Sequence, residues 1–405
     1  MSRNDWRGDS QPVAQRRRFT IGGTPAAGNT VSVVVNRKSA TYTVLAGDTV
    51  ALVAAGLAAA WDGASFPEKA EANTDYTAAN AYLDLVAATA GVPFTATAAA
   101  TGGGATNTAT DVTASAGPNH ADDPNNWTLG TVPAGTDSVV VNGGASLLWG
   151  LGSITCAAWE FRPGFQNEVG LPPYNATGYA EYRTPELTIN APTVVVDCPS
   201  SRLFLKAVAG SSWLVRSTGT RGDASTPALD IGATGNPAAV SVAGGDVGFL
   251  TRDESAARTV TAASLTGDGS VLTTGRTSTV TALDMDRGTA VALGTVSALT
   301  MGRGSYTQAE GALTAFTAYG GTIYLNHAGS TTPTCRGTGG GELGPVVDCS
   351  ANNLARTFPN SEFVGGAYLL DENKSVTLTG GGTHTADATF FAHSLLGPLV
   401  TWNRT

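Results

Sequence analysis

The sequence predicts a mainly β protein in which a small N-terminal α+β or β-sandwich domain is followed by a parallel β-helix (β-solenoid) body. Three observations lead to this prediction. Charged residues make up only 14% of the 405 residues, the chain holds 51 glycines, and short β-branched runs recur between glycine turns. Because 42% of the residues are hydrophobic, the chain can bury a core, and its surface must consist largely of small uncharged residues that suit tight turns and stacked strands.

Residues 1–18 form a polar segment without hydrophobic periodicity. This pattern predicts a flexible N-terminal arm that becomes ordered only against a partner. Arg16, Arg17 and Arg18 give the arm a local positive patch in a chain with a net charge of −9. They are therefore candidate partner-docking residues, and a solvated tail is the alternative interpretation.

Residues 19–117 are expected to form the small domain. Runs of β-branched and apolar residues predict strands, the first three of which are expected to form two hairpins. Thr49 precedes apolar residues at helical spacing, which predicts a helix of about three turns over residues 50–61. The pattern weakens over the Gly/Thr/Ala-rich residues 98–117, where we place the domain boundary. The predicted strands are 19–23, 30–36, 40–44, 81–86 and 93–97.

Several short motifs within this segment are diagnostic when taken together. They are Ile21-Gly-Gly-Thr24, Ala27-Gly-Asn-Thr-Val31, Tyr42-Thr-Val44, Ala46-Gly-Asp-Thr49, Leu57-Ala-Ala-Ala-Trp61 and Ala90-Gly-Val-Pro-Phe94. With these motifs the segment resembles a small sandwich-type domain that recurs in tail sheath, tail fibre and other virion proteins of tailed bacteriophages. The resemblance covers roughly a quarter of the chain. It implies a role in a virus particle and brings no catalytic residue with it.

The run Asp122-Asp-Pro-Asn-Asn-Trp127, followed by Val132-Pro-Ala-Gly-Thr-Asp-Ser-Val139, resembles the segment that opens many β-helical surface and virion proteins. In that setting Asn126 and Trp127 close the end of the solenoid, and the turn at Asp137 starts the first strand. A solenoid end exposes unpaired strands and an apolar interior, so it needs a bulky cap. Trp127 is the predicted cap residue.

Residues 118–385 are expected to form the parallel β-helix, and residues 386–405 a C-terminal cap or tail. Turn glycines follow short apolar runs at intervals of 16 to 25 residues, which fits one coil per interval, and a glycine permits a corner with positive φ. The best-matched runs are 280–285 and 296–301, followed by 313–318. A β-sandwich of short strands is the structural alternative. The glycines are Gly245, Gly269, Gly288, Gly304, Gly321, Gly341 and Gly366.

No residue pattern indicates catalysis, a cofactor or a metal site. None of the four histidines has catalytic or metal-ligand spacing. Asp284 and Asp286 beside Arg287 form the only carboxylate pair with an adjacent arginine on the repeats, and their two-residue spacing marks the solvent face of a strand rather than a glycosidase pair. The cysteines show no Cys-x-x-Cys motif and are expected to be reduced and buried. They are Cys156, Cys198, Cys335 and Cys349.

Tyr174, Tyr179 and Tyr182 lie in one Pro- and Tyr-rich stretch and are candidate contacts for a glycan or a partner. An insertion folded back on the solenoid is the alternative interpretation. The tripeptides Arg7-Gly-Asp9 and Arg221-Gly-Asp223 match an integrin-binding motif, but a chain rich in Arg and Gly produces such tripeptides by chance.

These observations predict a non-enzymatic structural component of a bacteriophage virion, of the capsid-decoration, head-fibre or tail-fibre type. We expect it to form a homotrimer and to contact other virion proteins, with a host surface glycan as a further candidate partner. The acidic charge balance argues against nucleic-acid binding, and the longest apolar run, residues 50–61, is too short to span a membrane.

The polar N-terminus lacks the apolar region of a secretory signal, so we expect synthesis in the host cytoplasm and a final location in the virion. Two other functions compete with this prediction. A tailspike-type glycan-binding or glycan-degrading protein requires a groove, with paired carboxylates if it is an enzyme. A secreted β-helical adhesin requires an export signal.

Overall fold

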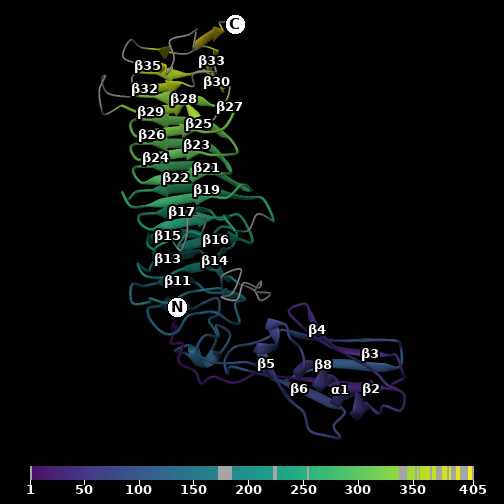
Figure 1. Cartoon of the computed structure of the whole chain (residues 1–405). Coiled ribbons are helices and arrows are strands. Elements are labelled where there is room, and N and C mark those ends of the chain that lie inside the picture. Colours follow the sequence, from purple (N-terminus) through teal and green to yellow (C-terminus); the bar gives the residue numbers. More distant parts are fainter. Residues whose placement is uncertain are drawn as a thin grey trace.

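The computed structural model shows a mainly β protein, as predicted, with 48% of residues in strands and 7% in helices (Figure 1). Most strands belong to two long parallel sheets that stack upward from the base, where the N-terminal sheets lie to one side (Figure 1). The structure describes residues 2–171, 185–221, 226–252, 255–336, 344–351, 354, 356–364, 367–370, 376–380, 383–384, 389–392 and 400–403.

Within the described residues, one long sheet has 13 strands and the other has 12. From β9 onward the chain adds a strand to one sheet and then to the other. In spatial order the larger sheet contains β1 (Arg3–Asp5), β9 (Ser138–Val141), β11 (Ala158–Phe161), β13 (Thr193–Asp197), β15 (Ser212–Ser217), β17 (Ala239–Val242), β19 (Arg258–Leu265), β21 (Ser278–Met285), β23 (Thr295–Met301), β25 (Leu313–Ala318), β28 (Thr332–Cys335), β31 (Glu362–Phe363) and β34 (Thr383–His384). The smaller sheet contains β10 (Ser153–Thr155), β12 (Leu187–Asn190), β14 (Leu203–Ala207), β16 (Leu229–Ala233), β18 (Asp246–Phe249), β20 (Val271–Thr274), β22 (Thr289–Ala292), β24 (Ser305–Gln308), β26 (Thr322–Leu325), β29 (Val346–Cys349), β32 (Ala367–Leu370) and β35 (Thr389–Ala392).

The register of these sheets matches the repeat found in the sequence. Val280 of β21 pairs with Val296 of β23, and Met285 pairs with Met301. The third predicted run, β25, pairs with β23 in the same way. Each of these pairings is parallel, whereas the sheets of a β-sandwich are antiparallel. The sandwich alternative is therefore wrong for this part of the chain.

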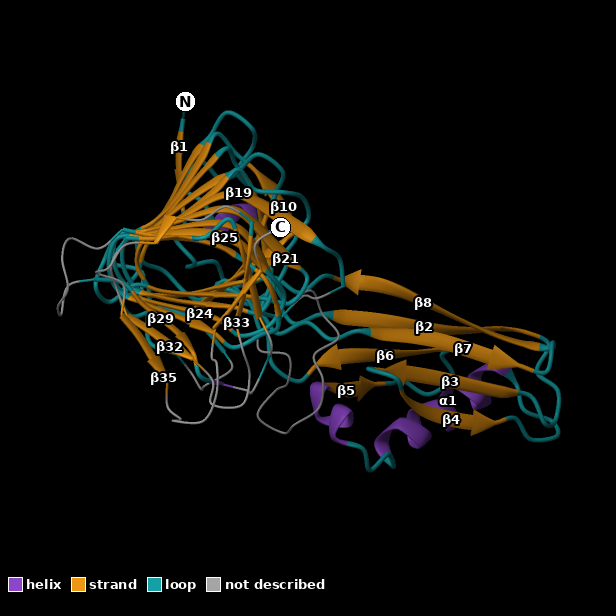
Figure 2. Cartoon of the chain, turned by 90° about the horizontal axis from the view of Figure 1, so that it is seen from above, coloured by secondary structure: helices purple, strands orange, loops and turns teal. Residues whose placement is uncertain are grey.

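Both long sheets contribute to one hydrophobic core. Alternate side chains along a strand point inward, so Val296, Leu299 and Met301 of β23 are buried. The alternation breaks between Val296 and Leu299, where two residues that are not buried stand in succession. Seen end-on, the strands of successive coils superpose in bands, and the N-terminal sheets project to one side (Figure 2). The same two-residue break recurs in β19 and β21, and the parallel pairing aligns the buried residues on either side of it.

Glycine is required where coils turn closely over one another. Gly288, Gly304 and Gly321 have φ values of +88°, +93° and +75°, as the repeat predicted. A Cβ atom on Gly304 would lie 2.3 Å from the carbonyl oxygen of Gly288, so a side chain is excluded. Gly269 differs, because its φ is outside the left-handed region and its Cβ position is open. Gly341 and Gly366 lie outside the described residues.

A further parallel sheet adds a side to the coils at the C-terminal end. The expected cap or tail over residues 386–405 differs from the structure, because β35 and β36 lie in this range and continue the stacking. The strands of the added sheet are β27 (Gly329–Ser330), β30 (Arg356–Pro359), β33 (Val376–Thr379) and β36 (Val400–Asn403).

The N-terminal part contains two antiparallel sheets and one α-helix around a separate hydrophobic cluster that includes Phe19, Val33, Leu57, Trp61 and Leu85. The four-stranded sheet has the order β5 (Ala72–Asp75), β6 (Tyr82–Ala87), β2 (Arg16–Gly23) and β8 (Ala105–Thr113). The three-stranded sheet has the order β4 (Lys38–Thr43), β3 (Thr30–Val35) and β7 (Ala96–Thr101). The helices are α1 (Val50–Asp62) and the short 3-10 turns η1 (Pro67–Glu71) and η2 (Pro124–Asn126).

Helix α1 forms where the sequence predicted it, and the Thr49 side chain accepts a hydrogen bond from the Leu52 amide at its start, 3.3 Å long. Only one of the two expected hairpins forms, between β3 and β4. Strand β2 instead pairs with β6 and β8. Strand β8 lies within the stretch that we assigned to the domain boundary. Its Thr and Ala residues have no apolar pattern, so the sequence did not indicate a strand, but their backbone pairs with the edge of β2.

The flexible arm predicted for residues 1–18 is a wrong prediction. Residues 3–5 form β1, which pairs in parallel with β9 of the larger sheet. Residues 16–18 begin β2, the strand on which the four-stranded sheet is built. The short polar strand β1 has no hydrophobic period, so its local sequence does not indicate that it pairs with another strand.

Candidate functional site

The chain crosses twice between the long sheets and the N-terminal sheets. It leaves β1 and reaches β2 through residues 6–15, and it returns from β8 to β9 through residues 114–137. The N-terminal sheets are therefore an insertion in the sequence between β1 and β9, two strands that pair directly with each other in the larger sheet. This junction fixes how the two parts are attached, and it is the candidate functional site.

An aromatic column closes the base of the core at this junction. Trp127 is 1% exposed and Trp6 is 4% exposed, and their ring centroids lie 5.0 Å apart in an edge-on arrangement. Trp127 also packs on Trp159, with 6.1 Å between ring centroids. The Trp6 indole donates to the carbonyl oxygen of Ala145, and the Trp127 indole donates to that of Ala121, both at 2.9 Å. The structure thus places Trp127 at the end of the stack and covers it with Trp6.

Sequence reasoning missed Trp6 because it assigned this residue to the flexible arm. The available signal was a single Trp in an otherwise polar stretch, since a bulky indole in such a segment usually packs against something.

Polar side chains hold the returning segment in place. Asn126 is fully buried and donates to the carbonyl oxygens of Gly117 and His120, at 2.8 and 2.9 Å. His120 is also buried, and its Nε2 lies 3.1 Å from the carbonyl oxygen of Gly91 in the N-terminal part. The hydrogen bond from His120 holds the pKa of Asp122 below its usual value. These contacts tie both sides of the junction to one short segment.

The turn at Asp137 starts strand β9, as the sequence indicated. Its carboxylate accepts hydrogen bonds from the Ala134 amide and the Ser2 hydroxyl, each 2.9 Å long. The bond from Ala134 is the main cause that lowers the pKa of Asp137. The first residues of the chain are thereby fixed to the same turn that begins the stack.

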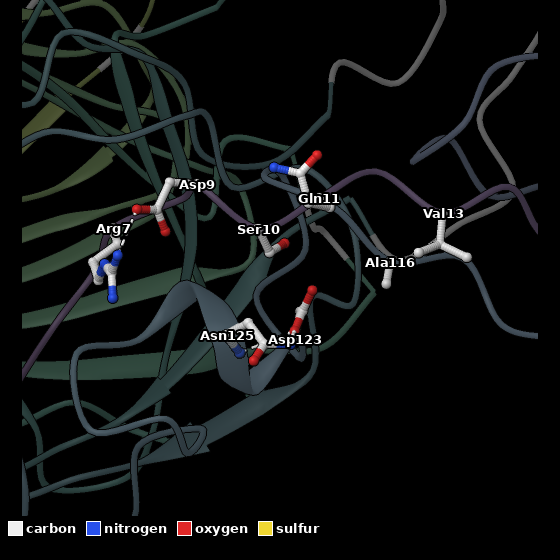
Figure 3. Close-up of a pocket in the computed structure, with 8 residues that line it drawn as sticks. All are labelled: Arg7, Asp9, Ser10, Gln11, Val13, Ala116, Asp123 and Asn125. Carbon is white, nitrogen blue, oxygen red and sulfur yellow. Dashed lines mark hydrogen bonds and ion pairs between the residues drawn. The ribbon is translucent and has the colours of Figure 1, made fainter.

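A polar cavity of about 450 Å³ opens between the two crossing segments (Figure 3). Arg7 and Asp9 line one end and form an exposed ion pair of 2.8 Å. Asp123 and Asn125 line the opposite side, where the Asp123 carboxylate accepts from the Asn125 amide at 3.0 Å. Gly8 lies too close to the Ala145 amide for any side chain. The first integrin-like tripeptide is therefore built into the junction.

The three arginines of the predicted docking patch are engaged within the N-terminal part. Arg18 donates two hydrogen bonds to Asp84, at 2.8 and 2.9 Å, and Arg16 lies 3.3 Å from the same carboxylate. The bonds to Asp84 raise the pKa of Arg18. Arg17 pairs with Asp111 at 2.6 Å.

These arginines therefore lie on a strand and not on an arm, and acidic residues of neighbouring strands pair with all three. Their role in docking stays a prediction. One of these acidic partners, Asp84, could have been found in the sequence, because its carboxylate lies inside the apolar run of β6. An acidic residue in such a run needs a cationic neighbour.

Asp284 and Asp286 occupy the outer surface, and Asp284 is exposed on β21. Arg287 lies 3.4 Å from the Asp286 carboxylate and 3.3 Å from that of Asp268 on the preceding coil. These charges raise the pKa of Arg287, with Asp268 as the main cause. Where the chain is described, no group of three or more His, Cys, Asp or Glu side chains is arranged to hold a metal ion.

The other sequence candidates divide into two groups. Tyr174, Tyr179 and Tyr182 lie outside the described residues. All four cysteines are buried. Burial raises the pKa of Cys156 to about 11 and that of Cys198 to about 12, so neither thiol is set up as a nucleophile.

Comparison with known proteins leaves the family open, because no protein-family model and no curated protein matches the chain. Over the residues that the structure describes, no helix has the length and apolar character needed to cross a lipid bilayer.

Proposed function

We propose that this protein is a non-enzymatic structural component of a bacteriophage virion, with a parallel β-helix as its body. The long sheets support the β-helix, because the chain alternates between two parallel sheets that share one core. The resemblance of the N-terminal segment to tail sheath and tail fibre domains supports the virion assignment. Its expected location is the particle, after synthesis in the host cytoplasm.

The observation that carries the proposal is the insertion of the N-terminal sheets between β1 and β9. Two chain crossings, the Trp6–Trp127 contact and the His120 contact to Gly91 attach these sheets to the base of the body. An attachment domain held at two points transmits load better than one on a single tether. This arrangement suits a body that projects from a particle and is anchored at its base.

The proposal that the protein is not an enzyme draws on the state of its acidic residues. Arg287 pairs with Asp286 and Asp268, so one member of the Asp284/Asp286 pair is partly neutralised. A retaining or inverting glycosidase needs two carboxyl groups that face each other across a substrate. Capsular polysaccharide incubated with the purified protein should release no reducing ends. Turnover that is lost in Asp284→Ala would contradict this part of the proposal.

Gradient-purified particles of the phage that encodes the chain provide the direct test. Quantitative mass spectrometry should find the protein at a fixed copy number per particle, and a deletion mutant should lack it. A protein that is present in infected cells but absent from particles would refute the virion assignment.

We further propose a homotrimer held at least partly through the N-terminal region, because the fibrous β-helical virion proteins that the body resembles are commonly trimeric and the body carries few charges to desolvate. Sedimentation analysis of the isolated protein at micromolar concentration should give three times the chain mass. A stable monomer would contradict the trimer without affecting the location in the particle.

A further inference from the structure

A groove of about 570 Å³ lies on the outer face of the smaller long sheet, away from the junction. This volume falls within the range of about 300–1,000 Å³ that is usual for ligand sites. Arg221 and Asp246 line one end, and Val271, Thr273 and Val291 form the floor. The groove thus combines a charged pair with an uncharged surface.

One end of the groove holds two polar groups that hydrogen-bond to each other. Arg221 donates from Nε and Nη2 to the two carboxylate oxygens of Asp246, each bond 2.7 Å long. The Asp246 side chain is only 13% exposed, and that of Arg221 is 35% exposed. Behind them Pro227 covers Gly248, where a Cβ atom would lie 2.5 Å from the Pro227 ring. From Gly248 the groove continues over Thr273 and Val291 toward the C-terminal coils.

The floor continues in that direction as two straight columns of side chains. Parallel pairing aligns Thr273, Val291, Thr307 and Tyr324 in one column. The same pairings align Val271, Thr289, Ser305 and Thr322 in the other. None of these eight residues is charged, and Tyr324 is 36% exposed.

The spacing of the strands gives the length of this surface. Four strand intervals separate Asp246 on β18 from Tyr324 on β26. At about 4.8 Å per interval the span is about 19 Å. The hydroxyl groups of Thr and Ser, the methyl groups of Val and one exposed aromatic ring lie along it, whereas a surface for a polyanion requires several cationic side chains.

Sugars match this combination of groups. Vicinal hydroxyls donate and accept hydrogen bonds in the same plane, as an Arg–carboxylate pair does, and the C–H face of a pyranose ring packs on an aromatic ring. We propose that the groove binds an uncharged linear oligosaccharide of about four units, a length set by the span of about 19 Å. One end contacts Arg221 and Asp246, and the other end stacks on Tyr324. This inference does not depend on the proposed virion function.

Calorimetric titration of the full-length protein tests the site, with uncharged linear gluco-, manno- and galacto-oligosaccharides of two to six units as probes. We expect at least one series to bind, with affinity rising up to about four units and then levelling off, because longer chains reach no further contact on the span of about 19 Å. A matched set of acidic oligosaccharides is measured in parallel. Binding of the acidic set alone, or no binding of any uncharged probe at millimolar concentration, would overturn the proposal.

Two variants and one matched control locate the site. Tyr324→Ala should lower the affinity for the tetrasaccharide about tenfold and leave the affinity for the disaccharide unchanged, because only the longer chain reaches the ring. Asp246→Asn should weaken both. Tyr319 is a more exposed tyrosine, 51% exposed, that lies outside the two columns, so Tyr319→Ala should bind as the unmodified protein does.

The variants also separate binding from folding. Tyr324 is at the surface, so Tyr324→Ala should melt at the temperature of the unmodified protein. Equal loss of tetrasaccharide binding in Tyr319→Ala and Tyr324→Ala would refute the assignment of the site. These binding assays use the isolated protein and do not involve phage particles, so failure of this proposal leaves the virion proposal standing.

Discussion

Replacement of Trp6 by alanine tests whether the first residues of the chain close the base of the body. Trp6 is 4% exposed, and truncation of a buried Trp to Ala costs about 3–5 kcal/mol. Within this total, loss of the hydrogen bond to Ala145 accounts for about 1 kcal/mol and loss of the edge-on contact with Trp127 for about 0.5–1.5 kcal/mol. Because each coil contacts only its neighbours, the loss should be concentrated at β1 and β9.

Hydrogen exchange followed by mass spectrometry measures this local effect. In Trp6→Ala the amides of residues 138–141 should lose protection by about a hundredfold or more, since each 1.4 kcal/mol changes an opening equilibrium about tenfold. Trp6→Phe should retain most of the protection. Leu129, a neighbouring residue that is 48% exposed, provides the control, and Leu129→Ala should leave β9 unchanged. Unchanged protection of β9 in Trp6→Ala would refute the reasoning.

Three further predictions concern the N-terminal sheets, the turns and the thiols. Asp84→Asn should lower the free energy of unfolding by about 1–3 kcal/mol, since Asp84 is buried and its arginine partners are one-third exposed. Asp111 is exposed, so Asp111→Asn should lower it by less than about 1 kcal/mol in the same denaturant titration. Gly304→Ala should destabilise the fold by more than about 1 kcal/mol, whereas Gly269→Ala, with open space at its Cβ position, should not; equal melting temperatures would contradict the account of the turns. The four cysteines should react with an alkylating reagent only after unfolding under non-reducing conditions, and a linked pair found by mass spectrometry would contradict this expectation.

The sequence was most informative where a pattern repeats. The match between runs 280–285 and 296–301 predicted the register of β21 and β23, because identical apolar positions must face the same core. The glycine spacing predicted the tight corners at Gly288 and Gly304, because both corners have a positive φ, which glycine adopts without a steric cost. Thr49 likewise marked the start of α1 through its own side chain.

The junction was not predictable in the same way. Strand β1 is three polar residues long, and its partner β9 lies more than a hundred residues further along the chain. Trp6 contacts Trp127, more than a hundred residues away, and Arg18 pairs with Asp84, 66 residues away, and no local period records such contacts. The Arg221–Asp246 groove also arises only when neighbouring coils stack, so the sequence showed two ordinary surface residues.

Electron cryo-microscopy of purified particles tests the central proposal most directly. The account predicts, on the particle surface, rods of stacked strands about 4.8 Å apart, with the inserted N-terminal sheets at the attached end of each rod. The chain should fit this density with β1 and Trp6 at the base. Particles that contain no such rods, or rods attached through the C-terminal coils with the N-terminal sheets pointing away, would contradict it.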